Sequence, residues 1–216
     1  MAAADDLALL IQSRYPLIAA ETVEEHRFQR TLLQVAESLR VPFYEWSLTE
    51  GLHRIPALGA VYDTTEPMKA LNNIAGMTGE AIFFMKDLRR FLEKAEIVRK
   101  LGDLAPHFTM DRRVMVLLAA KDSLPAELQP LAAPYTFALP DVAELKAVAK
   151  SLIERIRKER PLRVELTDAE MDTCVDRLRG MTSFEAERTL SQAIVRDNTA
   201  LSAFAEVAFL PPMSGG

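Results

Sequence analysis

The sequence is poor in the residues from which disulfides and metal sites are usually built. Its 216 residues include one cysteine, Cys174, so no disulfide can form within the chain. The three histidines, His26, His53 and His107, lie far apart and show no metal-ligand spacing. These absences exclude a disulfide-stapled secreted fold, and we predict no zinc site and no other metal site.

Long apolar runs and an excess of positive charge are also lacking. The most apolar stretch, residues 114–120, is far too short to span a membrane, and the N-terminus carries acidic residues where a signal peptide would carry basic ones. Lys and Arg total 26 against 31 Asp and Glu, and this net charge of −5 disfavours non-specific attraction to nucleic acid. We therefore expect a cytoplasmic protein that neither crosses a membrane nor coats nucleic acid.

The sequence does contain a regular alternation of short apolar runs with amphipathic helical patterns. This alternation is typical of a parallel sheet that is covered by helices on both faces. The predicted fold class is therefore α/β, with a doubly wound parallel sheet. Strands are predicted at residues 17–20, 42–48, 60–62, 81–85, 114–119 and 135–139, and helices at 7–15, 23–40, 68–76, 88–102 (ending at Gly102) and from just past Pro140.

After Pro161 no strand-like run remains, and three successive helices are expected. Two capping-box patterns, each a threonine followed three residues later by a glutamate, occur at residues 167–170 and 182–185, and Gly180 stands where the helix between them should end. The predicted domains are an α/β core at residues 1–160, a helical lid at 161–210, and a flexible tail or linker at 211–216.

This layout resembles that of the AAA+ ATPases. The segment at 81–92, AIFFMKDLRRFL, is similar to their Walker B strand and the helix after it, and the segment at 114–128, VMVLLAAKDSLPAEL, to their sensor-1 strand and its turn. Residues 15–52 resemble the first strand, the phosphate-loop helix and the second strand, while FALPD at 137–141 resembles the start of the last core helix. The resemblance implies a three-layer core like that of P-loop NTPases, with a small C-terminal helical lid.

Three segments carry a narrower resemblance: YPLIAAETVEEHR, AIFFMKDLRRFL and VRKLGDLA. They are similar to the front half of a group of AAA-type ATPases known as hypothetical reading frames of chloroplast and cyanobacterial genomes. In that group a degenerate AAA-like half precedes a second half with an intact phosphate loop. The resemblance implies that this chain holds the degenerate half, and that its partner is an active AAA+ domain or subunit.

The residues at the expected phosphate loop depart from the family pattern. That pattern, G-x-x-x-x-G-K-[ST], uses glycines and a lysine to surround phosphates, and this sequence has no Gly-Lys pair. Thr22 and Glu25 form a third capping-box pattern, so we expect the helix to satisfy its own free N–H groups. Carboxylates at Glu21, Glu24 and Glu25 would repel phosphates from this helix end. We therefore predict no bound nucleotide or other cofactor.

The expected positions for the metal ion and for γ-phosphate sensing are altered as well. Lys86 and Asp87 stand where the Walker B carboxylates would be, and a lysine there would repel magnesium. We expect Lys86 to pair with an acid such as Glu21. Alanines occupy 119–120, where sensor 1 needs a polar side chain, and residues 131–135 contain no arginine that could act on a neighbouring subunit.

No replacement catalytic group is apparent in the sequence. Cys174 falls on an apolar helical stripe and His26 on a charged one, which indicates a core residue and a solvated residue. Two basic stretches are expected to be solvated or to contact proteins. They comprise Arg89, Arg90, Lys94, Arg99, Lys100, Arg112 and Arg113, and then Lys150, Arg155, Arg157, Lys158, Arg160 and Arg163.

The hypothesis that follows is a catalytically inactive AAA-like domain that acts as a protein-interaction or assembly module, with oligomerisation left open. Two alternatives remain at this point. One is an atypical ATPase that binds nucleotide through Lys86 and backbone groups. The other is a regulatory or nucleic-acid-binding module that uses the basic stretches.

Overall fold

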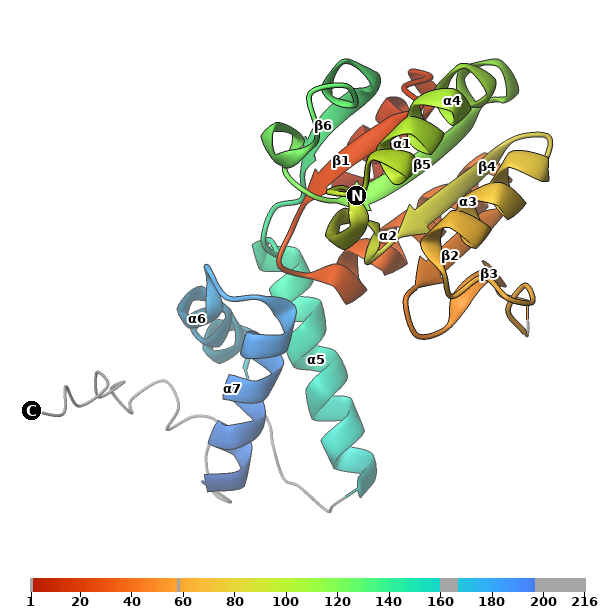
Figure 1. Ribbon diagram of the computed structural model, residues 1–216. Coiled ribbons are helices and arrows are strands. Elements are labelled where there is room, and N and C mark those ends of the chain that lie inside the picture. Colours follow the sequence, from red (N-terminus) through yellow and green to blue (C-terminus); the bar gives the residue numbers. More distant parts are fainter. Residues whose placement is uncertain (1, 58, 160–166, 197–216) are drawn as a thin grey trace, which may run out of the picture. The chain divides into compact units, whose positions relative to one another are not determined.

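A six-stranded sheet lies at the centre of the first of two units, which divide between Ala138 and Leu139 (Figure 1). The computed structural model describes residues 2–57, 59–159 and 167–196. The strand order is β3-β2-β4-β5-β1-β6, and every neighbouring pair is parallel except β2 with β3. The strands are β1 (Leu17–Glu21), β2 (Phe43–Ser47), β3 (Gly51–Ile55), β4 (Ala81–Met85), β5 (Arg113–Leu118) and β6 (Ala132–Thr136).

Helices cover both faces of this sheet, and a separate hydrophobic core lies on each face. Successive side chains of a strand point to opposite faces, so Ile82 and Phe84 of β4 belong to one core while Phe83 and Met85 belong to the other. The first core contains side chains of α1 (Ala2–Gln12) and α2 (Glu25–Leu39), and the second contains side chains of α3 (Pro67–Gly76) and α4 (Ala95–Asp111). The predicted α/β class, a doubly wound sheet with helices on both faces, is confirmed, and the one departure from a parallel sheet is the antiparallel β2–β3 pair.

Helix α4 differs from its prediction at both ends. Residues Leu88–Phe91 form a short 3₁₀ helix, and α4 then runs through Gly102 instead of ending there. Its buried side chains Leu101, Leu104 and Phe108 continue the apolar stripe beyond the glycine. Burial of two such side chains outweighs the cost of about 1 kcal/mol that a glycine imposes within a helix.

The edge of the sheet beyond β2 also differs from its prediction. The expected strand at residues 60–62 is wrong, because this segment forms only an isolated bridge, between Ala60 and His53. The strand at this edge is β3, which pairs with β2 as an antiparallel hairpin. Its sequence, GLHRI, lacks the clear alternation of apolar and polar residues by which a strand is predicted.

The second unit consists of helices. They are α5 (Val142–Glu159), α6 (Asp168–Leu178) and α7 (Ser183–Arg196). Leu145 and Leu152 of α5 share a core with Val175 of α6 and Leu190 of α7, so α5 packs within the helical unit. The units consequently divide after Ala138, whereas the domain boundary expected from the sequence was at residue 160.

The two capping boxes of the helical unit are confirmed. In each, the threonine hydroxyl accepts from the backbone N–H of the glutamate, and the glutamate carboxylate accepts from the backbone N–H of the threonine. Gly180 ends α6 with a φ of +84°, which glycine adopts without strain. The third predicted helix and the tail at 211–216 lie outside the described residues.

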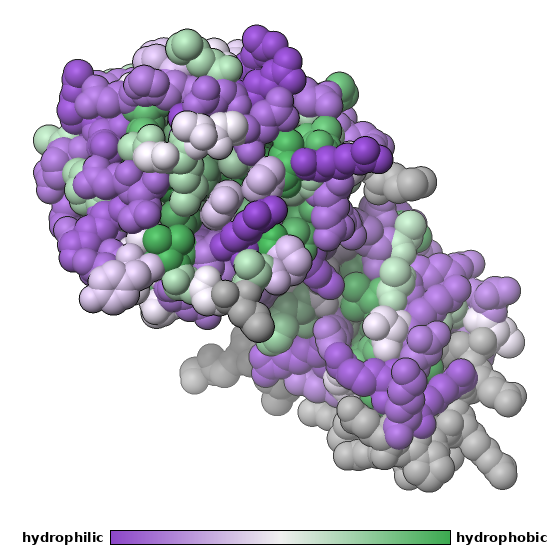
Figure 2. All heavy atoms as spheres, turned by 90° about the vertical axis from the view of Figure 1, so that its right-hand side faces the viewer, coloured by the Kyte–Doolittle hydropathy of each residue, from purple (hydrophilic) through white to green (hydrophobic). Residues whose placement is uncertain are grey.

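Two further observations concern the surface. None of the helices in the described ranges has both the length and the apolar composition needed to cross a bilayer. On the face seen in Figure 2, apolar residues form small patches separated by polar ones.

Candidate functional site

The carboxyl ends of β1, β2, β4 and β5 lie at the same edge of the sheet, where ligands bind in most open α/β folds. A cavity of about 320 Å³ lies at this edge. Its lining includes the side chains of both residues at the Walker B position. The lining residues are Glu25, Lys86, Asp87, Arg89, Arg90 and Leu118.

The loop between β1 and α2 has no capping box. Helix α2 begins at Glu25, its N-cap is Glu24, and no side chain caps it. The hydroxyl of Thr22 instead accepts from the backbone N–H of Glu24 over 3.0 Å. The prediction of a box between Thr22 and Glu25 is therefore wrong, because the threonine lies two residues before the N-cap and bonds within the loop.

An ion pair holds this loop to the helix. The Glu24 carboxylate, 5% exposed, accepts from Nε of Arg27 over 2.7 Å. The guanidinium of Arg27 also donates to the carbonyl of Ala138 and lies 4.2 Å from the ring centre of Phe137. The start of α2 is thereby fixed to the segment after β6 by side-chain contacts.

Lys86 pairs with other acids than the one expected. Its ammonium group contacts Oε1 of Glu45 on β2 and lies 3.8 Å from a carboxylate oxygen of Glu25. The Gln29 amide donates to the second carboxylate oxygen of Glu45, which is 2% exposed as a residue. The predicted pair with Glu21 is wrong because β5 separates β1 from β4, whereas β2 adjoins β4 directly.

Asp87 holds a neighbouring turn in place. Its carboxylate accepts from the backbone N–H of Leu48, in the turn between β2 and β3, over 3.0 Å. The guanidinium of Arg90 lies 3.8 Å away. The carboxylate at this position thus connects the end of β4 to the hairpin at the edge of the sheet.

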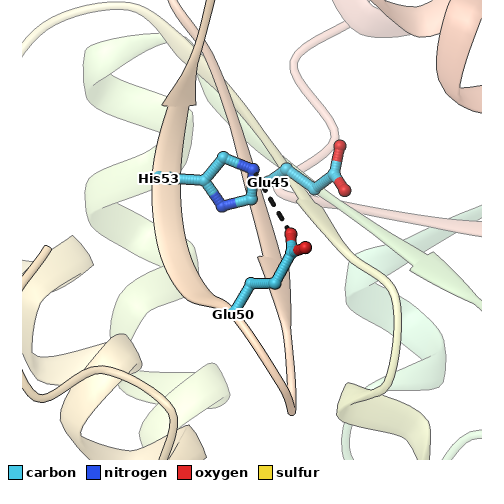
Figure 3. A group of neighbouring side chains, drawn as sticks. All are labelled: Glu45, Glu50 and His53. Carbon is cyan, nitrogen blue, oxygen red and sulfur yellow. Dashed lines mark ion pairs between the residues drawn. The ribbon is translucent and has the colours of Figure 1, made fainter. Parts of the chain in front are cut away.

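The hairpin brings together a group that the sequence analysis missed. One ligand atom from each of Glu45, Glu50 and His53 lies within 4.8 Å of the others (Figure 3). His53 lies directly opposite Glu45 in the β2–β3 pairing. Sequence spacing alone did not reveal this group because β3 itself was not predicted; a hairpin with Glu45 opposite His53 would have been the signal.

The remaining candidate residues fall mainly where their sequence contexts suggested. Cys174 is buried beside Met171 and Leu178, and burial raises the pKa of its thiol, an effect partly offset by Arg177. His26 is exposed on α2.

One member of the first basic stretch is not on the surface at all. Arg113 is 4% exposed and donates to the carbonyls of Ile74 and Met77 and to Asp111. Other members are paired with acids: Arg112 with Glu80, and Arg99 with Asp103. In the second stretch, Arg160 and Arg163 lie outside the described residues. The first stretch therefore offers a weaker positive field than its composition suggested.

Comparison with known proteins identifies the family. The profile for the N-terminal domain of SpoVK-like AAA ATPases matches residues 3–137, and the profile for their second domain matches residues 143–204. The chain belongs to the SpoVK-like AAA ATPases. The two matched ranges meet between residues 137 and 143, close to the division between the two units of this SpoVK-like chain.

Curated relatives confirm the narrower resemblance. The chain is 26% identical over 198 residues to the uncharacterized AAA domain-containing protein ycf46 of Trieres chinensis, and 27% identical over 192 residues to that of Guillardia theta. These alignments cover 90% and 88% of this chain but 38% and 37% of the relatives. The chain therefore spans less than two fifths of the length of these relatives.

Solved structures show the same fold. The AAA domain of FIGL-1 in complex with ADP has a TM-score of 0.62 at 10% identity, with 84% of this chain and 61% of that chain covered. A point mutant of Thermotoga maritima RuvB has a TM-score of 0.56 at 18% identity, with 90% and 63% covered. At such identities the likeness establishes an AAA+ fold and nothing further.

Proposed function

We propose that the α/β unit is a non-hydrolysing AAA-like module that serves as a protein-interaction or assembly unit. Its partner in this proposal is an active AAA+ domain, in the same polypeptide or in another subunit. The observation that carries the proposal is a pair of buried ion pairs, Glu24 with Arg27 and Glu45 with Lys86, at the edge of the sheet where a nucleotide would bind.

The loop before α2 is poorly suited to phosphate. A phosphate loop needs backbone N–H groups that converge on the anion, and glycines allow this approach. The corresponding loop here, residues 21–24, contains no glycine, and its Thr22 hydroxyl already accepts a hydrogen bond from the backbone N–H of Glu24. Glu24 and Glu25 add two carboxylates at the start of α2, where phosphates would meet like charge.

The end of β4 is equally unsuited to a magnesium ion. Hydrolysis needs carboxylates that hold the metal and orient water. Lys86 places a cation there and is engaged by Glu45 and Glu25, while Asp87 binds the backbone of Leu48. These contacts support a structural role for both residues.

Isothermal titration of the folded chain with MgATP tests the loss of chemistry. We expect no measurable heat of binding. A Kd below about 100 μM, equivalent to about −5.5 kcal/mol, would contradict the proposal. Buried Trp46 reports through its fluorescence that the α/β unit is folded in the sample used.

The interaction half of the proposal needs a separate measurement. The chain is mixed with an active AAA+ domain from the remaining length of a ycf46-type relative, and native mass and phosphate release are recorded. We expect a complex and an altered ATPase rate. Unchanged mass together with an unchanged rate would refute the assembly role whatever the nucleotide titration shows.

A second candidate function is an atypical nucleotide-binding ATPase, favoured by the cationic side chains of Lys86, Arg89 and Arg90 around the 320 Å³ cavity. This candidate requires steady phosphate release by the unmodified chain. Asp87→Ala should abolish the release, and Lys69→Ala, a control at an exposed lysine of α3, should leave it unchanged. The absence of any release from the unmodified chain would eliminate this candidate.

A further inference from the structure

We propose that the β2–β3 hairpin carries a binding site for a divalent transition-metal ion, formed by Glu45, Glu50 and His53. Figure 3 shows His53 of β3 and Glu50 of the connecting turn facing each other, with the Glu45 side chain of β2 beside them. One ligand atom from each of the three lies within 4.8 Å of the others. Glu45 also pairs with Lys86, so the site adjoins the cavity described above, but the proposal requires neither nucleotide binding nor an assembly role.

The backbone of the hairpin prearranges the three residues. Glu45 and His53 are a directly opposed cross-strand pair, so their side chains project from the same face of the sheet. Gly51 begins β3 with a φ of +74°, and a β-carbon there would lie 2.8 Å from the hydroxyl oxygen of Thr64. Only glycine fits this tight turn, which directs Glu50 back toward the strand pair.

The distances require only a small contraction. Nε2 of His53 lies 3.9 Å from Oε2 of Glu50, and the three ligand atoms all lie within 4.8 Å of one another. Bonds of about 2.0–2.2 Å to zinc place the ligand atoms of a tetrahedral site about 3.4 Å apart. The Glu50 side chain is 67% exposed, so a change of rotamer can bring its carboxylate closer to Nε2 of His53.

The imidazole has a partner that favours the tautomer needed for metal binding. Nδ1 of His53 lies 3.4 Å from the backbone carbonyl of Gly51. A proton on Nδ1 leaves the lone pair of Nε2 directed toward the carboxylates. Metal-binding histidines commonly donate their other ring N–H to a carbonyl or carboxylate in this way.

The local charge favours a dication. Three carboxylates (Glu25, Glu45 and Glu50) and one ammonium group (Lys86) give this group a net charge of −2 with His53 neutral. Both oxygens of Glu45 already have a partner, Oε1 the Lys86 ammonium group and Oε2 the Gln29 amide. Each carboxylate oxygen has two acceptor positions, so Glu45 can bind a metal ion while it keeps these contacts.

The donor set decides the class of ion. One imidazole and two carboxylates suit Zn²⁺, Mn²⁺ or Fe²⁺ better than Mg²⁺ or Ca²⁺, which prefer oxygen ligands alone. Three protein ligands also leave a position open for water. We therefore use Zn²⁺ as the probe and Mg²⁺ as the comparison ion.

The test is calorimetric titration of the full chain, free of affinity tags, with zinc chloride. We expect one site with a Kd below about 10 μM, or about −6.8 kcal/mol. Glu50→Gln and His53→Ala should each weaken binding at least about tenfold. Mutation of residues that only hydrogen-bond to metal ligands already weakens metal binding by about 10- to 100-fold, so loss of a ligand should cost at least as much. Matched changes at exposed residues of α2, Glu37→Gln and His26→Ala, should leave the Kd unchanged.

A second measurement identifies the ligand atom. Nitrogen NMR of the imidazoles should show a zinc-induced shift of Nε2 of His53 and none for His26, and Mg²⁺ should shift neither. A Kd weaker than about 1 mM, or equal affinity in the His53→Ala and Glu50→Gln variants, would show an adventitious ion only and overturn the proposal. Glu50 is exposed, so we expect Glu50→Gln to fold. Its zinc affinity therefore tests the metal site even if His53→Ala does not fold.

Discussion

The buried pair of Lys86 and Glu45 yields a direct test of the network at the edge of the sheet. Lys86→Met keeps the unbranched apolar part of the side chain but removes its ammonium group, and so leaves the Glu45 carboxylate, 3% exposed, without its cation. Removal of one partner from a buried ion pair typically costs about 3–5 kcal/mol. Because Lys86 is itself 14% exposed, we expect a loss near the lower limit, about 3 kcal/mol.

The assay is urea unfolding followed by tryptophan fluorescence. The single tryptophan, Trp46, is fully buried on β2, so its signal reports the α/β unit and not the helical one. With an m-value of about 2 kcal/mol per molar, a loss of 3 kcal/mol lowers the unfolding midpoint by about 1.5 M urea.

A double variant separates an uncompensated charge from a simple packing defect. Glu45→Gln in addition to Lys86→Met removes both charges and keeps an amide acceptor for Gln29, so stability should return to within about 1 kcal/mol of the unmodified chain. Lys69→Met, which removes an exposed pair with Asp63, should cost far less than Lys86→Met. A loss below about 1 kcal/mol for Lys86→Met, or no recovery in the double variant, would refute this reasoning.

The other predictions concern the helical unit and two glycines. Thr167→Ala should lower the stability of α6 by about 1 kcal/mol at neutral pH, measured by hydrogen exchange of its amides. Hydrogen bonds from the Thr167 backbone and hydroxyl hold the pKa of Glu170 below its usual value. The contribution of the ionised carboxylate to folding stability is therefore fully present above the usual pKa, about 4.3, and is lost as the pH falls through the lowered pKa. Gly180→Ala, at a φ of +84°, should cost about 1 kcal/mol. Gly102→Ala lies within α4 and has open space around the new methyl group, so it should instead stabilise the α/β unit by about 0.5–1 kcal/mol. Gly180→Ala should therefore lower the Tm and Gly102→Ala should raise it.

An unchanged stability of Gly180→Ala would show that the positive φ at this position imposes no strain on alanine. An unchanged pH dependence of α6 exchange in Thr167→Ala would show that the capping box does not hold the charge of Glu170. Destabilisation by Gly102→Ala would show that α4 does not tolerate a regular helix residue at that position.

Strong local periodicity explains which parts of the fold could be predicted. The runs that became β4 and β5 are buried almost throughout, and α2 has an apolar stripe at regular helical spacing, so the bounds of each were predicted to within two residues. Strand β3 has no such pattern and depends on its pairing with β2. Its pairing is a tertiary effect that local sequence does not encode.

Strand order limits prediction of the site in the same way. The candidate positions Lys86 and Asp87 could be located from their place after a buried strand, but their partners could not. The pair between Lys86 and Glu45 depends on β2 lying beside β4, and the group containing His53 depends on the hairpin register. Similarly, the sequence indicates the helix α5 but not the unit with which it packs.

The two outer strands constrain how any partner can attach. Beyond β3, Ala60 forms its bridge to His53 and the Val61 N–H donates to the Leu52 carbonyl, so part of that border already has a chain alongside it. At the opposite border, β6 contains Pro134, which has no N–H to offer an added strand. Growth of the sheet from one molecule into the next is therefore discouraged on both sides, and the association that we propose with an AAA+ domain would use side chains of helices and loops.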